Sequence, residues 1–135
     1  ARAGERVLLL EGKDDGGRKI LISGGGRCNV LPGELVPGRF HSESSPNLVR
    51  KLLLAWPLAG QRAFFEEDLG LPLALEAESG KLFPASNRAR DVRDRLVDAV
   101  RRAGAELRTG VKVRDLVPHD GGWRVRDLRA RGLSR

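Results

Sequence analysis

Several residue types are scarce in this chain of 135 residues, and each scarcity excludes a class of protein. The single cysteine, Cys28, leaves no partner for an internal disulfide and fits a reducing, cytoplasmic compartment. Two histidines and one cysteine do not suffice for an ordinary zinc site, so we expect no bound metal. No apolar run approaches the roughly 20 residues that span a bilayer, and no secretory signal pattern is present. We therefore expect no membrane association.

Aromatic side chains make up only 4% of the chain, which bears on the meaning of its positive charge. The net charge of +7 arises within residues 85–135, which hold 14 basic and 7 acidic side chains, whereas residues 1–84 hold 11 of each. A basic half is typical of a nucleic-acid-binding module, which is one alternative function. No aromatic platform for stacking bases is interleaved with the basic cluster, so we favour a solvated surface and expect no nucleic-acid partner.

Common nucleotide-binding and catalytic motifs are also missing. The triple glycine is followed by Arg27-Cys28 where a P-loop needs Lys and then Ser or Thr. The G-x-G-x-x-G spacing of dinucleotide-binding loops is absent, and nothing marks a nucleophile elbow. The sequence therefore assigns no catalytic residue.

The length of the chain predicts a single domain, and the alternation of predicted helices and strands predicts the α/β class. The apolar run at residues 7–10 predicts a strand that is buried on both faces, as in a parallel sheet, and the end of a helix is predicted before Gly4. Helices are also predicted over residues 47–56, 59–70 and 86–104, the last with Ser86 as its N-cap and Gly104 as its stop. Further strands are predicted as a hairpin turning at Ser79-Gly80, as one or two short strands within 105–117, and after the Gly121-Gly122 turn.

Glu11 follows the apolar run at residues 7–10 directly. In dinucleotide-binding folds an acidic residue in this place accepts hydrogen bonds from the two ribose hydroxyls, because one carboxylate can accept two O–H donors. A glycine-rich phosphate loop is expected about twenty residues earlier, which would place it before Ala1. We interpret Glu11 as a ribose ligand, against the alternative of an ordinary surface residue.

The most unusual stretch is the glycine run, which consists of Ser23, Gly24, Gly25, Gly26, Arg27, Cys28 and Asn29 and follows a short, strand-like apolar segment. A plain turn needs one glycine, whereas three suit a backbone that an anion or a flat ring must approach closely. Arg18, Lys19 and Arg27 flank the run and would neutralise a pyrophosphate. Cys28 has no second cysteine to pair with, so we interpret it as a packed residue or a passive cofactor contact.

Three stretches of the sequence together resemble one family. EGKDDGGRKILISGGGRCNV resembles the bacterial BaiN-like, aminoacetone-oxidase-type NAD(P)/FAD-dependent flavoproteins. GKLFPASNRARDV resembles that family's GR-x-FP block, with Lys81 in place of the usual arginine, and AGAELRTGVKVRDL resembles the strand pair that closes its adenine pocket. The family usually continues Cys-Asn-Val-Thr-Asn, whereas Leu31-Pro32 follow Val30 here. The resemblance covers nearly the whole chain.

The resemblance implies an incomplete Rossmann-like FAD/NAD(P)-binding domain of a two-dinucleotide-binding-type flavoprotein, without the first strand, the phosphate loop or the substrate domain. It implies an FAD-dependent oxidoreductase with a small-molecule substrate and NAD(P)H as a candidate electron donor. Glu11 would hold the adenosine ribose, and Val113 would present its backbone to the adenine edge. Arg18 and Lys19 would lie along the phosphates and ribitol, and the glycine run would approach the flavin. The remaining alternatives are the nucleic-acid-binding module at residues 85–135 and a remnant without function.

Overall fold

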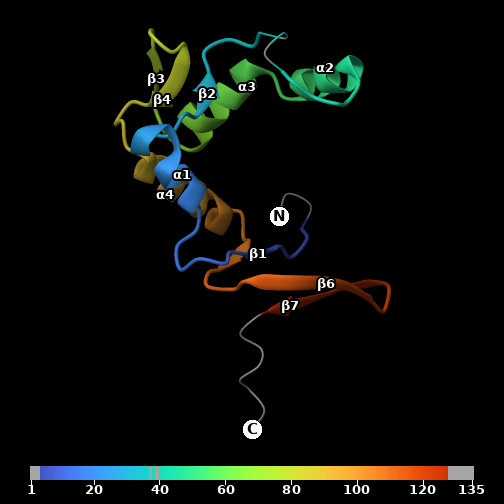
Figure 1. Ribbon diagram of the computed structural model, residues 1–135. Coiled ribbons are helices and arrows are strands. Elements are labelled where there is room, and N and C mark those ends of the chain that lie inside the picture. The colour runs from blue at the N-terminus through green and yellow to red at the C-terminus, as the bar shows by residue number, and fades with distance from the viewer. Residues whose placement is uncertain (1–3, 37, 39, 128–135) are drawn as a thin grey trace. The chain divides into compact units, whose positions relative to one another are not determined.

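The computed structural model in Figure 1 describes residues 4–36, 38 and 40–127. The chain divides into two compact units, the first made of Ala1–Arg18 with Leu96–Arg135 and the second of Lys19–Arg95. Each unit is described by itself below. None of the helices in the described ranges is both long enough and apolar enough to cross a membrane.

The first unit contains a parallel pair of strands, β1 (Leu8–Leu10) and β5 (Glu106–Arg108). Leu9 lies opposite Leu107 in their register. The pairing is extended at one end by a hydrogen bond of 2.9 Å from the Glu11 amide to the Arg108 carbonyl. Parallel strands need a crossover connection, and α4 (Ala89–Arg102) precedes β5 as the last element of this crossover. The prediction of an α/β fold is therefore confirmed.

The prediction that residues 7–10 are buried on both faces is wrong. Val7, Leu8 and Leu9 retain 40%, 47% and 47% of their accessible surface. Among the described strands, β1 pairs with β5 alone, and a two-stranded pair leaves most of both faces uncovered. The helix end predicted before Gly4 falls on residues 1–3, which lie outside the described residues.

A second element of the first unit is an antiparallel hairpin of β6 (Val113–His119) and β7 (Gly122–Asp127). Its ladder is irregular between Val113 and Asp115, where the register shifts. Both strands were expected from the sequence, and the turn falls at Asp120-Gly121, where the two residues adopt positive φ angles of 47° and 75°.

The second unit begins within α1 (Arg18–Ile22), which runs across the boundary between the units and leads into a 3₁₀ turn, η1 (Ser23–Gly26). The interpretation of the apolar segment before the glycines as strand-like is therefore wrong. A run of three apolar residues is too short to distinguish a strand from one turn of helix by its pattern.

Three short antiparallel strands form the sheet of the second unit, in the order β2-β4-β3. They are β2 (Leu31–Pro32), β3 (Leu73–Glu76) and β4 (Lys81–Pro84). The β3–β4 hairpin was predicted, and its tight turn is closed by a hydrogen bond of 2.9 Å from the Gly80 amide to the Glu76 carbonyl. Leu31-Pro32, where the sequence predicts no strand, forms the edge strand against β4.

Two helices connect β2 to β3, as the sequence predicts for residues 47–56 and 59–70. They are α2 (Pro46–Ala55) and α3 (Leu58–Ala63), and α3 continues directly into a π-helical turn, η3 (Phe64–Asp68). The hydroxyl of Ser45 caps α2 by accepting a hydrogen bond of 3.3 Å from the Leu48 amide, and Pro57 stands directly after its last turn.

The helix α4 is confirmed, but Ser86 is not its N-cap. The helix begins at Ala89, after Asn87 adopts a left-handed conformation with φ 55° that no helical turn can include. The Ser86 hydroxyl instead donates a hydrogen bond to the Asp91 carboxylate, which lowers the pKa of that group. The helix stops before Gly104, as predicted.

The hydrophobic core that the structure describes lies in the second unit. Its buried side chains come from the glycine run, the segment before β3, the β3–β4 hairpin and the start of α4. They are Cys28, Leu69, Leu71, Leu73, Leu82, Phe83, Pro84, Ala89 and Val92. The glycine run is therefore anchored on the best-packed part of the described chain.

Candidate cofactor site

In the first unit the structure brings two of the predicted cofactor residues to neighbouring segments. The amide of Val111 donates to the Glu11 carbonyl at 2.8 Å, and the amide of Gly110 donates to the Lys13 carbonyl at 2.7 Å. These bonds lay the segment that leads into Val113 alongside the segment that follows β1. Glu11, predicted for the ribose, and Val113, predicted for the adenine, therefore lie on adjacent stretches of backbone.

Glu11 stands just beyond the carboxyl end of β1, where α/β sheets bind their ligands. One of its oxygens, Oε1, accepts a hydrogen bond of 2.8 Å from the Lys13 amide, which orients the carboxylate. An ionised carboxylate offers about four acceptor positions, so this bond leaves capacity for hydroxyl donors. The chemistry of this position thus fits a ribose.

In the second unit the glycine run forms a tight left-handed turn. Gly24, Gly25 and Gly26 have φ angles of 54°, 66° and 84°, and Cys28, a buried non-glycine residue, has φ 67°. The turn is closed by a hydrogen bond of 3.1 Å from the Cys28 amide to the Ser23 carbonyl. Residues with a β-carbon rarely adopt three such angles in succession, so the backbone conformation itself requires the glycines.

The three glycines differ in what surrounds them. A β-carbon on Gly24 would lie 2.8 Å from Oδ1 of Asn29 and 3.3 Å from the Phe83 ring, so the protein's own packing fills that space. A β-carbon on Gly25 would meet nothing within 4 Å, and one on Gly26 would come no closer than 3.9 Å to another atom. Gly25 therefore presents bare backbone to open space, as a flat ring approaching the run would need, whereas a β-carbon on Gly26 would make an ordinary van der Waals contact with the Leu21 carbonyl.

The three cations predicted to flank the cofactor differ in their surroundings. Nη1 of Arg27 lies 2.6 Å from Oε1 of Glu76, and its guanidinium lies 4.3 Å from the centroid of the Phe83 ring. The hydroxyl of Ser79 and then Arg27 hold the pKa of Glu76 below its usual value. Arg18 and Lys19 are exposed on α1 and form no ion pair with another described residue.

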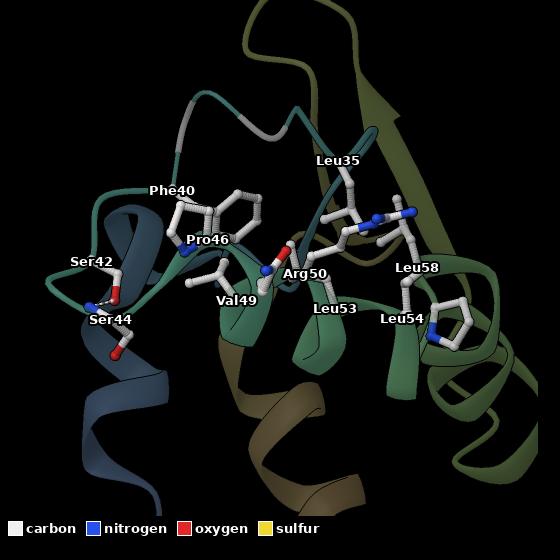
Figure 2. A pocket seen from close by; sticks show the side chains of 12 residues that line it. Leu35, Phe40, Ser42, Ser44, Pro46, Val49, Arg50, Leu53, Leu54 and Leu58 are labelled. Carbon is white, nitrogen blue, oxygen red and sulfur yellow. Dashed lines mark hydrogen bonds between the residues drawn. The ribbon is translucent and has the colours of Figure 1, made fainter.

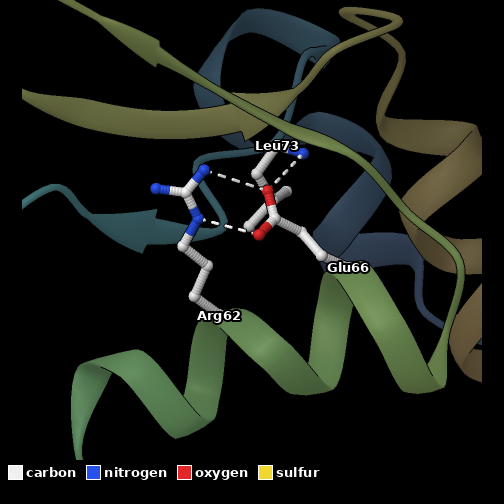
Figure 3. A network of polar contacts seen from close by, with 3 residues as sticks. All are labelled: Arg62, Glu66 and Leu73. Atoms are coloured by element: carbon white, nitrogen blue, oxygen red, sulfur yellow. Dashed lines mark hydrogen bonds and ion pairs between the residues drawn. The ribbon is translucent and has the colours of Figure 1, made fainter.

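A second polar network joins the helical segment of α3 and η3 to the start of β3 in the β3–β4 hairpin (Figure 3). Glu66 accepts two hydrogen bonds from the guanidinium of Arg62, at 2.8 and 3.1 Å, and one of 3.3 Å from the Leu73 amide at the start of β3. The bond from Arg62 is the main reason that the pKa of Glu66 is lowered. Glu66 thus binds the backbone at the start of β3, and the side chain of Glu76, at its other end, binds Ser79 and Arg27.

An apolar pocket of about 650 Å³ lies elsewhere in the second unit, between α2 and the loop before it (Figure 2). Arg50 is its charged lining residue and points along it toward Leu58. Arg50 forms no ion pair with another described residue. The apolar lining comes from Leu35, Phe40, Pro46, Val49, Leu53, Leu54, Pro57 and Leu58. None of the predicted cofactor residues lines this pocket.

Sequence reasoning did not find Glu76, Phe83 or this pocket. Glu76 and Phe83 come from a hairpin about 50 residues after the glycine run, and no local spacing connects a lone acidic residue to a distant arginine. The predicted hairpin was the available signal. Residues two apart on one strand project from the same face of a hairpin, as do residues that lie diagonally across its two strands. The pocket depends on how a loop with several prolines folds over α2, which the pattern of apolar residues does not specify.

Three features of the first unit are typical of a Rossmann-like domain: a parallel strand pair, a helix before its second strand in the chain, and an acidic residue after its first strand. The chain matches the HI0933-like protein Rossmann domain family over residues 1–131 and belongs to that family. It is 31% identical over 121 residues to the 3-dehydro-bile acid delta(4,6)-reductase of Clostridium scindens, covering 90% of this chain and 29% of the relative. It is 30% identical over 123 residues to the ribosomal RNA dihydrouridine synthase of Escherichia coli K12, covering 90% of this chain and 30% of the relative.

These matches confirm the resemblance to flavoproteins and support a flavoprotein oxidoreductase at the level of the family. The chain spans less than a third of the length of both relatives, which are named for different substrates. Neither match tests the role of an individual residue, so the assignments of Glu11, Arg18, Lys19, the glycine run and Val113 stay predictions.

Proposed function

We propose that this chain is part of an FAD-dependent oxidoreductase and contributes residues to the binding of its cofactor. Glu11 binds the adenosine ribose, and the backbone beside Val113 meets the adenine. Gly25 and Gly26 form the surface that the flavin approaches. The observation that carries the proposal is the bare left-handed turn at Gly25, where a β-carbon would meet no protein atom within 4 Å.

The chemistry of the residues present fits an FAD molecule. A carboxylate beyond a parallel strand accepts ribose hydroxyls, a backbone edge accepts adenine without any particular side chain, and Arg18 and Lys19 supply positive charge for phosphates. FAD would supply the hydride chemistry, with NAD(P)H as its electron donor. The residues of this chain bind and orient the cofactor, and no group among them is assigned a proton transfer.

The substrate we propose is a small molecule in the cytoplasm. The pocket on α2 supports this, because its volume of about 650 Å³ and largely apolar lining are typical of sites for small organic ligands. Arg50, which has no ion-pair partner among the described residues, would favour a ligand that carries an anionic group. The single cysteine, which has no partner in this chain for an internal disulfide, fits a reducing compartment.

The test uses the whole protein that carries this chain. We expect it to purify with a flavin absorbance spectrum, and we expect Glu11→Ala to weaken FAD binding about 10- to 100-fold, because the ribose loses a charged acceptor. The dissociation constant is measured by titrating the FAD-free protein and following flavin fluorescence.

Glu5→Ala is the matched control, because Glu5 is an exposed carboxylate of the same unit that precedes β1. The Glu5→Ala variant should bind FAD with the same affinity as the unmodified protein. A colourless protein that FAD does not bind, or equal affinities in the two variants, would contradict the proposal. Salt-dependent retention of RNA or DNA by a colourless protein would favour the nucleic-acid-binding alternative instead.

A further inference from the structure

We propose that Arg27 is a positioning residue that fastens the glycine run to the β3–β4 hairpin, and that it does not contact the cofactor's phosphates. Glu76 and Phe83 are the two residues that hold it, and the three together are called the Arg27 clasp. The clasp itself rests on contacts within the second unit, whereas its effect on FAD rests on the function proposed above.

The hairpin presents both partners of Arg27 on one face. Ala74 lies opposite Phe83, and Glu76 lies opposite Lys81, so Phe83 and Glu76 project from the same side of the two strands. Arg27 reaches over this side, with its guanidinium 2.6 Å from the Glu76 carboxylate and 4.3 Å from the Phe83 centroid. One contact satisfies its charge and the other stacks its plane against an aromatic ring, a combination to which arginine is better suited than lysine.

The same hairpin also determines the shape of the glycine run. The Phe83 ring lies against Gly24, where a β-carbon would approach it to 3.3 Å. The amide of Val30 donates to the Leu82 carbonyl at 2.9 Å, which fixes the chain where it leaves the run. Arg27 lies between Gly24 and Val30 in the chain. If its side chain loses its contacts with the hairpin, the backbone between these two residues becomes freer to move.

The geometry makes Arg27 a poor phosphate ligand. Its charge is already balanced by Glu76, and the Ser79 hydroxyl fixes that carboxylate from the other side with a hydrogen bond of 2.6 Å. A phosphate would have to compete with the Glu76 carboxylate for the charge of this guanidinium. Arg18 and Lys19, which have no such partners among the described residues, remain the cations available for that role.

Glu76→Gln separates the two roles because they predict opposite signs. If Arg27 is a clasp, Glu76→Gln weakens FAD binding about three- to tenfold, because the turn is less well ordered. If Arg27 is a phosphate ligand, removing a competing carboxylate leaves FAD binding unchanged or tightens it. The titration is carried out on the whole protein, together with Arg27→Gln and the double variant.

We expect the double variant to bind FAD no more weakly than either single variant, because both substitutions break the same contact. The visible absorbance spectrum of the bound flavin should shift in the same way in all three variants. Additive losses, or a loss in Arg27→Gln alone, would overturn the proposal.

Amide hydrogen exchange tests the clasp independently of the cofactor. The amides of Arg27, Cys28 and Val30 should exchange about three- to tenfold faster in Glu76→Gln. Glu106→Gln is the control, because Glu106 forms an ion pair of the same length, 2.6 Å, with Arg108 in the first unit. Unchanged exchange in Glu76→Gln would overturn the clasp even if FAD binds, whereas faster exchange in a protein that binds no FAD would support the clasp and contradict only the proposed function.

Discussion

The two units of this chain bury their apolar residues very differently. The first unit contains the longest strand-like apolar run, yet Val7, Leu8 and Leu9 are about half exposed. The second unit contains every buried hydrophobic side chain of the described residues, although its strands have no more than four residues each. Burial therefore follows the number of elements that converge on a residue, and the hydrophobicity of the run itself does not decide it.

Core substitutions should produce the largest difference between the units. Phe83→Ala removes a ring that is 4% exposed, and we expect it to lower the free energy of unfolding by about 3–5 kcal/mol. Leu9→Ala removes a side chain that is 47% exposed, and we expect a loss of about 1 kcal/mol or less. Urea denaturation of the two variants measures both. Equal losses would show that the first unit is packed far more tightly than its exposed leucines indicate.

Substitutions within the glycine run should sharpen the contrast between packed and open positions. Gly24→Ala places a methyl group 2.8 Å from Asn29 and requires a positive φ, so we expect a loss of about 2–3 kcal/mol in the free energy of unfolding. Gly25→Ala requires a positive φ but meets no atom, so we expect about 1–2 kcal/mol. Thermal and urea denaturation check the order. A larger effect at Gly25 would mean that the open space beside it is not open in solution.

The same pair of variants also separates stability from cofactor binding. A methyl group on Gly25 projects into the space proposed for the flavin, so Gly25→Ala should weaken FAD binding more than its modest loss of stability implies. Retention of full flavin absorbance by Gly25→Ala would contradict the close approach of the ring to this position.

Much of the secondary structure could be predicted from the sequence, and the reasons are local. The helix α4 has its apolar residues at helical spacing, and the β3–β4 hairpin has a Ser-Gly turn between apolar strands. The segment Ile20–Ile22 was assigned incorrectly because a single helical turn has no period to detect. Ser86 was assigned incorrectly because the left-handed Asn87 delays the helix, and the general tolerance of asparagine for that conformation does not say at which asparagine it occurs.

The candidate site could be predicted only in part, for the same physical reason. Glu11 and the glycine run stand out because their chemistry and spacing are unusual within a few residues. Glu76 and Phe83 do not stand out, because their importance comes from tertiary contacts with Arg27. The partner of a charged side chain depends on which strands pair, and that pairing is a property of the folded chain.

Acid should act on the Glu76 carboxylate of the second unit. The Ser79 hydroxyl and then Arg27 and Lys81 lower the pKa of Glu76. A carboxyl group whose pKa is lower in the folded state stabilises the fold above its ordinary pKa, and this contribution is lost as the pH falls through the lowered value. We therefore expect the Arg27 and Cys28 amides to lose protection below about pH 4, and Glu76→Gln to lose that pH dependence. Unchanged pH dependence in this variant would assign the effect to another group.

The smallest effect is expected at the exposed ion pair of the first unit. Glu106 and Arg108 are neighbours on β5, and each side chain is more than half exposed. Solvent screens such a pair and its side chains lose rotational freedom when it forms, so Glu106→Gln should leave the urea midpoint unchanged within experimental error. A clear shift of the urea midpoint would show that this ion pair stabilises the fold despite its exposure to solvent.

The reactivity of Cys28 reports how often the glycine run opens. It is the only thiol in the chain, it is 6% exposed, and it lies inside the left-handed turn of the glycine run. A thiol-modifying reagent can react with it only after the turn has opened, so the rate of labelling reports how often that opening occurs. The rate of this one reaction, measured without any introduced probe, thus gives the rate at which the seven-residue glycine run opens.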